Sequence, residues 1–175
     1  MRPKLIILSD LWGIKKSNWV NIYTKRLNEK FDVKYYDCCE LGEIDTSIYN
    51  QDILHNQFIN GGIEIAASRL LELEKGKINI LAFSIGGTIA WKAGVKGLKI
   101  NNLYAISSTR LRYESKKPNC KINLIFGEKD NFKPNADWFK KTKVKFEIIK
   151  NEGHEIYQNP NNVLRVCEEI KKQYI

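Results

Sequence analysis

The sequence predicts an α/β protein: a three-layer sandwich whose mostly parallel sheet of about six strands is covered by helices on both faces. Short apolar runs alternate with longer amphipathic segments, the order expected when parallel strands are joined by crossover helices. Several runs carry apolar residues on both faces, as in strands buried on both sides. With 175 residues, 43% of them hydrophobic, the chain can bury one substantial core, so we expect a single domain over residues 1–175.

The expected elements follow one another along the chain. Short runs dominated by apolar residues predict strands at residues 4–8, 31–36, 78–83, 102–107, 121–126 and 145–150. Between them, apolar residues recur three or four positions apart, which places them on one face of a helix. This spacing predicts helices or helical turns at residues 18–30, 61–76, 86–97, 136–142 and 161–174.

Ser84 stands in the stretch "AFSIGG", directly after the expected strand 78–83. In a parallel sheet covered on both faces, binding groups gather beyond the carboxyl ends of the strands. A sharp turn from strand to helix crowds the residues two before and two after its centre, and here these are the small Ala82 and Gly86. The pattern A-x-S-x-G, a variant of G-x-S-x-G, favours a nucleophilic serine. A serine that caps the helix remains the alternative. A phosphate-binding loop is disfavoured because neither G-x-x-x-x-G-K-[ST] nor G-x-G-x-x-G occurs in the sequence.

A serine nucleophile needs a base, and the sequence contains two histidines. His154 follows the expected strand 145–150 in the loop "NEGHEIY", whereas His55 lies in a polar stretch with no strand before it. His154 is therefore the candidate base. Its alternative is an ordinary histidine of a surface loop.

The base needs a carboxylate to orient it, and "LIFGEKDNF" offers Glu128 and Asp130 after the strand 121–126. Asp130 is the better candidate, because three turn residues before it let its side chain reach a neighbouring loop. An ordinary turn aspartate is the alternative. Ser84, Asp130 and His154 then each follow a different strand, in the order nucleophile, acid, histidine.

With these residues the sequence resembles the α/β-hydrolase superfamily over nearly its whole length. "AFSIGG" is similar to the nucleophile elbow, "LIFGEKDNFKP" to the acid loop, and "NEGHEIYQNPNNVLRVCEEI" to the histidine loop and final helix. The resemblance implies that Ser84 attacks a carbonyl carbon, His154 carries the proton and Asp130 holds the imidazolium. It also implies a minimal form of the fold, without the antiparallel strands of larger members.

The same resemblance implies an oxyanion hole made by the backbone N–H groups of Ile85 and Leu11. Leu11 lies in the loop after the first strand, where many relatives have a His-Gly pair; here Ser9 and Asp10 take the places of that pair. The carboxylate of Asp10 could repel an anionic intermediate or bind substrate. Asp10 and Trp12 are candidates for the substrate pocket, although packing of tryptophans onto the core is the alternative for Trp12.

A lid is expected to be absent or vestigial, because only about fourteen residues, 108–121, separate the apolar runs "LYAIS" and "INLIF". An open cleft bordered by positive charge favours a substrate that protrudes, such as an acyl group on a larger carrier, or an anionic ester. The bordering residues are Arg110, Arg112, Lys116 and Lys117.

Composition narrows the possible partners and location. The net charge of +9 attracts polyanions, but the lysines are dispersed and no nucleic-acid-binding motif accompanies them, so no nucleic-acid partner is expected. The apolar run at the N-terminus is too short for a secretory signal or a membrane span, and a cytoplasmic protein is expected. The four cysteines form no C-x-x-C pair, which predicts free thiols and no metal site.

Three classes of function remain open. The leading one is a serine hydrolase (an esterase or thioesterase) that acts on a small or carrier-bound acyl substrate through an acyl-enzyme and needs no cofactor. The second is a non-catalytic binding or interaction protein with the same fold, which the altered oxyanion loop keeps open. A nucleotide-binding α/β protein is third, disfavoured because no phosphate-binding motif follows the first strand. The oligomeric state is left open.

Overall fold

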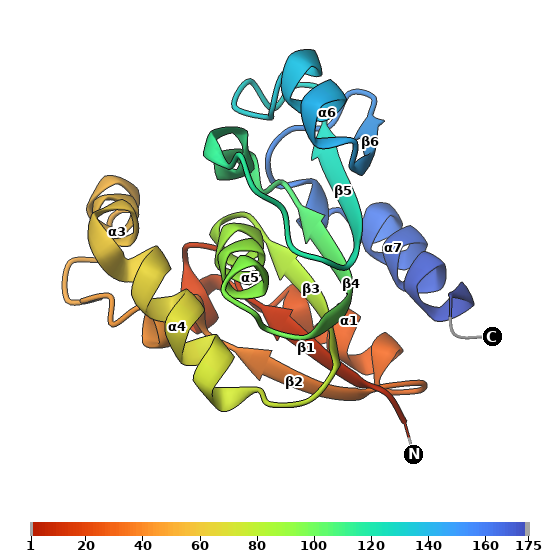
Figure 1. The fold of residues 1–175 in the computed structure, drawn as a ribbon, viewed down its shortest axis with the longest axis horizontal. Coiled ribbons are helices and arrows are strands. Elements are labelled where there is room, and N and C mark those ends of the chain that lie inside the picture. Colours follow the sequence, from red (N-terminus) through yellow and green to blue (C-terminus); the bar gives the residue numbers. More distant parts are fainter. Residues whose placement is uncertain (1, 174–175) are drawn as a thin grey trace.

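The computed structural model describes residues 2–173, which contain a six-stranded sheet in the order β2-β1-β3-β4-β5-β6 (Figure 1). Every neighbouring pair of strands is parallel. The predicted mostly parallel sheet is confirmed, and five of the six strands agree with the sequence-based ranges to within one residue at each end. The strands are β1 (Lys4–Leu8), β2 (Asp32–Tyr36), β3 (Ile78–Phe83), β4 (Ile100–Ile106), β5 (Lys121–Gly127) and β6 (Lys145–Ile149).

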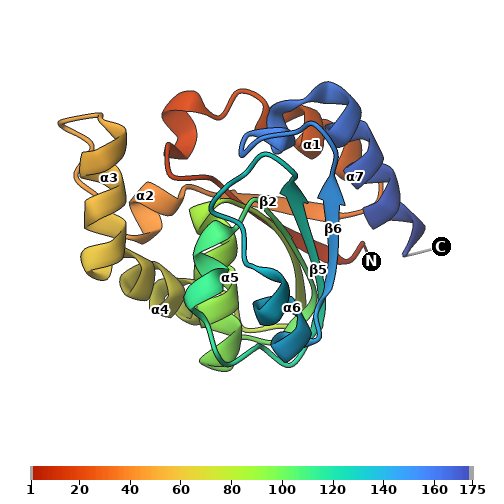
Figure 2. The ribbon, with the colours of Figure 1, turned by 90° about the horizontal axis from the view of Figure 1, so that it is seen from above.

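Helices cover both faces of the sheet (Figure 2). On one face lie α1 (Val20–Leu27) and α7 (Pro160–Lys172), which contact each other. The other face is covered by α4 (Ile63–Leu73), α5 (Ile85–Val95) and α6 (Ala136–Thr142). The predicted extension of the last helix to residue 174 lies outside the described residues. Short helices complete the chain: η1 (Gly13–Lys16), α2 (Cys38–Leu41), α3 (Gln51–Gln57), η2 (Phe58–Gly62), η3 (Thr109–Tyr113) and η4 (Ile156–Gln158).

The core forms two layers because side chains alternate along each strand. In β1, Leu5 and Ile7 pack with the residues of α1 and α7, whereas Ile6 and Leu8 pack with those of α4 and α5. All four side chains are fully buried. This double burial explains why β1 reads as a continuous apolar run.

The helix α3 is absent from the sequence-based prediction. Asn50 caps it, because its side-chain oxygen accepts hydrogen bonds from the N–H groups of Asp52 and Ile53. The chain then bends at Gly61, whose φ of 138° an L-residue rarely adopts, and enters α4. Figure 1 shows α3 at the far left of the molecule, beyond the edge of the sheet.

None of the helices between residues 2 and 173 is both long enough and apolar enough to cross a membrane.

Candidate active site

Ser84 occupies the sharp turn between β3 and α5. Its φ of 49° and ψ of −115° lie outside the regions that non-glycine residues favour, so the backbone is strained at this position. The N–H of Ser84 donates to the carbonyl oxygen of Ile106 at the end of the neighbouring strand β4. The turn is thereby fixed to the sheet while the serine hydroxyl projects beyond it.

Gly86 allows this turn to pack against the end of β1. A Cβ atom at Gly86 would collide with the carbonyl oxygen of Ser9 and lie 3.0 Å from the Cβ of Leu8. At Gly87 a Cβ atom would collide with the side chain of Ser108. The small residues of the motif are therefore required by close packing of β1, α5 and the end of β4.

His154 lies in the loop after β6, within hydrogen-bond distance of Ser84. Its Nε2 atom is 2.9 Å from Oγ of Ser84, and its side chain is 39% exposed. On the other side of the ring, Nδ1 is 2.7 Å from Oδ2 of Asp130. The structure thus brings the three residues Ser84, His154 and Asp130, each from a different loop, into one hydrogen-bonded row.

Asp130 is buried, with a side chain only 1% exposed. Burial raises the pKa of its carboxyl group, but the hydrogen bond and charge of His154 and the N–H of Phe132 outweigh burial, and the pKa lies below its usual value. An ionised carboxylate only accepts hydrogen bonds, so Nδ1 of His154 carries the proton and Nε2 is left to accept one from Ser84.

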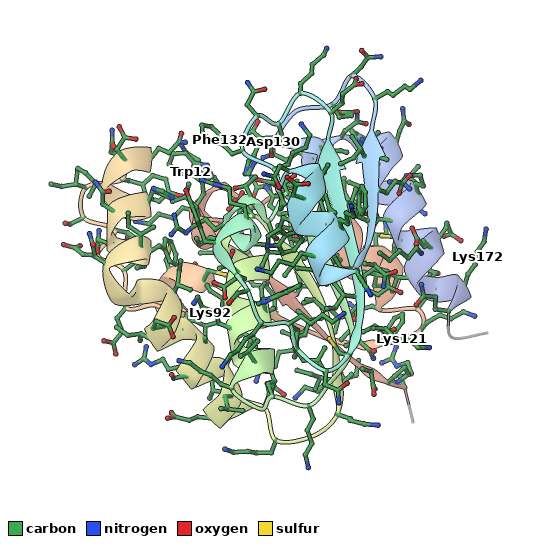
Figure 3. The ribbon with its side chains drawn as sticks, turned by 45° about the horizontal axis from the view of Figure 1, so that its top comes forward. Trp12, Lys92, Lys121, Asp130, Phe132 and Lys172 are labelled. Atoms are coloured by element: carbon green, nitrogen blue, oxygen red, sulfur yellow. The ribbon has the colours of Figure 1, made fainter. Side chains whose placement is uncertain are left out.

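The acid and histidine loops are held together by their backbones. Lys129 N–H donates to the carbonyl oxygen of Glu152 at 2.8 Å, next to Gly153 and His154. A Cβ atom at Gly127 would collide with the backbone of Glu152 and Gly153. Gly127 therefore lets the two loops approach closely enough for Asp130 to reach the imidazole. Figure 3 shows Asp130 and Phe132 at the same end of the sheet as Trp12, with Lys121, the first residue of β5, at the opposite end.

The two predicted oxyanion donors lie beside this row. Ile85 is the first residue of α5, so its N–H has no partner within the helix. Leu11 follows β1, and within residues 2–173 its N–H donates to no other group. Both residues line the cavity that contains Ser84 and His154.

Asp10 and Trp12 do not line this cavity. Asp10 is 1% exposed; its carboxylate accepts hydrogen bonds from Trp12 N–H at 2.9 Å and from the Tyr157 hydroxyl at 3.1 Å. Burial raises its pKa to about 6, and the two hydrogen bonds and His154 only partly oppose this effect. The Trp12 ring packs against Tyr49, whose hydroxyl donates to the Trp12 carbonyl oxygen. The hydrogen bond between Asp10 and Tyr157 therefore links the loop after β1 to the segment that follows His154.

The cavity has a volume of about 490 Å³ and is walled by η3 and by α3. Its lining includes His55 of α3, which the sequence does not predict as a site residue. The signal that could have placed His55 on a helix was Asn50 followed by Asp52, a cap and an acidic first turn. Within residues 2–173, no group of three His, Cys, Asp or Glu side chains is arranged to hold a metal ion.

No model of a known protein family matches the sequence, and neither does any curated protein. Solved structures do resemble it. A protein assigned to the α/β hydrolase superfamily from Xanthomonas campestris superposes with a TM-score of 0.70 at 16% identity, covering 98% of this chain and 99% of its own. Carboxylesterase CesB from Bacillus subtilis gives 0.64 at 13% identity, with coverages of 97% and 82%. An alpha-beta serine hydrolase homologue from Coxiella burnetii gives 0.64 at 15% identity, with coverages of 100% and 89%. The chain therefore has the α/β-hydrolase fold, and its structural neighbours include hydrolases.

Proposed function

We propose that this protein is a serine hydrolase that cleaves a carboxylic ester or thioester through an acyl-enzyme. The observation that carries the proposal is the row from Ser84 to His154 to Asp130, with spacings of 2.9 and 2.7 Å. A fold shared by many functions would not suffice alone. Ser84 and His154 line a cavity, and the strained turn at Ser84 presents the serine hydroxyl to it.

In the first half of the reaction, Nε2 of His154 takes the proton from Ser84 as Oγ attacks the carbonyl carbon. Asp130 stabilises the resulting imidazolium and keeps Nδ1 protonated. The negative charge on the carbonyl oxygen is met by the N–H groups of Ile85 and Leu11. The bond to the leaving group then breaks, and His154 gives its proton to the departing alcohol or thiol.

In the second half, a water molecule takes the place of the leaving group. His154 removes its proton, the water oxygen attacks the acyl carbon, and collapse of the second intermediate returns the proton to Ser84. The products are a carboxylic acid and the enzyme in its starting state. The cavity between α3 and η3 would accept either a small acyl substrate or one attached to a carrier.

Labelling with a fluorophosphonate, scored by intact mass, tests this proposal. The wild-type protein should gain one adduct per chain, whereas Ser84→Ala and His154→Ala should gain none. Ser47→Ala, an exposed serine outside the cavity lining, is the matched control. Absence of an adduct on a wild-type protein with intact circular dichroism would refute an activated serine and favour a non-catalytic binding protein.

A further inference from the structure

One wall of the cavity beside Ser84 is positively charged. Arg110 and Arg112, both on η3, line the cavity, and His55 reaches it from α3. Burial, followed by the charges of Arg110 and Arg112, holds the pKa of His55 below its usual value, while Asp52 opposes them. The three basic side chains therefore line the same cavity, and the charges of the two arginines act on the imidazole of His55.

The two arginines differ in their contacts with the rest of the protein. Arg112 is held in place: Nη1 donates to the carbonyl oxygens of Thr109 at 2.9 Å and Phe132 at 3.1 Å, and Nη2 donates to the Tyr113 hydroxyl. The guanidinium of Arg110 lies over the ring of Tyr113, 5.0 Å from the ring centre. Within residues 2–173, Arg110 has no hydrogen bond and no carboxylate partner.

The cavity also contains two carboxylates, those of Asp52 and Glu155. Neither forms an ion pair with Arg110 or Arg112 within the described part of the chain. The two arginines thus balance the two carboxylates in number, but both positive charges lie on the η3 wall and neither is neutralised by a direct ion pair among the described residues. The net charge of +9 adds a longer-range attraction for anions.

We propose that Arg110 binds an oxyanion of the substrate, so that the preferred esters or thioesters carry a carboxylate or phosphate away from the carbonyl that Ser84 attacks. This inference rests on the proposed function. A guanidinium presents a planar fork of N–H donors that matches carboxylate and phosphate geometry, and a fork without a protein partner is free to meet a ligand. Arg112 is fixed by its own hydrogen bonds and adds charge to the same wall.

Matched ester pairs test the inference on either side of the scissile bond. On the acyl side, p-nitrophenyl hemiglutarate is compared with p-nitrophenyl 5-methylhexanoate, in which an isopropyl group replaces the carboxylate. On the leaving-group side, 4-carboxyphenyl butyrate is compared with 4-carbamoylphenyl butyrate, and 4-phosphonooxyphenyl butyrate replaces the carboxylate by a phosphate. For each pair, the anionic-to-neutral ratio of kcat/KM is measured in the wild type and in Arg110→Gln. Comparing the two ratios cancels differences in intrinsic reactivity.

In at least one pair, Arg110→Gln should lower the ratio about tenfold or more, through KM, because a charge-assisted hydrogen-bonded contact is lost. The affected pair identifies the side of the substrate and the kind of anion. Lys140→Gln removes the same charge at an exposed position of α6, outside the cavity lining, and should leave the ratio unchanged. Ratios that stay the same in Arg110→Gln for every pair would overturn the inference.

Failure of the proposed function would look different, since no ester would be cleaved and no fluorophosphonate adduct would form. Binding of monomethyl glutarate and of phenyl phosphate, followed by titration calorimetry, then tests Arg110 directly. Weaker binding by Arg110→Gln than by the wild type supports the anion site. Equal binding, or none by either protein, overturns it.

Discussion

The Nδ1 atom of His154 lies 2.7 Å from a carboxylate oxygen of Asp130, although 24 residues separate them in the chain. The contact exists because β5 and β6 are parallel neighbours, so the loops after them leave the same end of the sheet. This hydrogen bond keeps the imidazole proton on Nδ1, so that Nε2 can accept the hydroxyl proton of Ser84.

Asp130→Asn should therefore lower kcat by roughly 10³- to 10⁴-fold on any ester that the protein cleaves. The amide can donate to Nδ1, which would move the imidazole proton to Nε2 and prevent it from accepting the serine proton. Ester hydrolysis and the rate of fluorophosphonate labelling measure the effect. Asp137→Asn, on an exposed position of α6, controls for the lost charge. A fall of less than tenfold would mean that Asp130 does not orient His154.

Gly86→Ala should destabilise the protein by about 1–3 kcal/mol, because the added methyl group would collide with the backbone carbonyl oxygen of the buried Ser9, directly after β1. Urea unfolding at pH 7 measures this loss. Gly76→Ala is the matched control, since a Cβ atom there meets no atom within 4 Å. Equal stability of the two variants would show that the turn at Ser84 does not depend on close packing against Ser9.

Much of the fold follows from local sequence, because buried parallel strands must be apolar on both faces. The row of Ser84, His154 and Asp130 could be anticipated for a related reason: parallel strands bring the residues that follow them to one end of the sheet. β4 begins two residues before the predicted range, and Asn102 within it is buried despite its polarity.

Other features depend on contacts that no local pattern reveals. The helix α3 is short, polar and largely exposed, so its apolar periodicity is weak, and its place at the cavity follows from the bend at Gly61. The burial of Asp10 depends on Tyr157, which lies 147 residues away. The proximity of Asp10 and Trp12 to Leu11 predicts that both line the pocket, but the side chain of Asp10 turns inward to Tyr157 and the Trp12 ring packs against Tyr49.

Asn50→Ala should increase amide hydrogen exchange across residues 51–57 about fivefold, which corresponds to the loss of an N-cap of about 1 kcal/mol. The substitution removes the oxygen that accepts from Asp52 and Ile53. Asn50→Ser keeps a capping oxygen and should retain most of the protection. Unchanged exchange in Asn50→Ala would indicate that burial of Leu54, and not the cap, holds this wall of the cavity.

Asp10 should make the protein less stable as the pH rises from 4 to 7. Its pKa is about 6 in the folded protein against a usual value of 3.8, so within this range the folded state binds more protons than the unfolded state. The free energy of unfolding therefore falls with rising pH, by about 2 kcal/mol between pH 4 and pH 7. The cause is the burial of a carboxylate whose two hydrogen bonds only partly replace water.

Asp10→Asn isolates this effect, because asparagine has nearly the same shape and stays neutral. Relative to the wild type, the variant should gain about 2 kcal/mol in free energy of unfolding between pH 4 and pH 7, measured by urea titration at both values. The other carboxylates titrate in both proteins, so their contributions cancel. Asp137→Asn again controls for the lost charge. A stability difference between Asp10→Asn and the wild type that does not change with pH would mean that Asp10 ionises as freely in the folded chain as in the unfolded one.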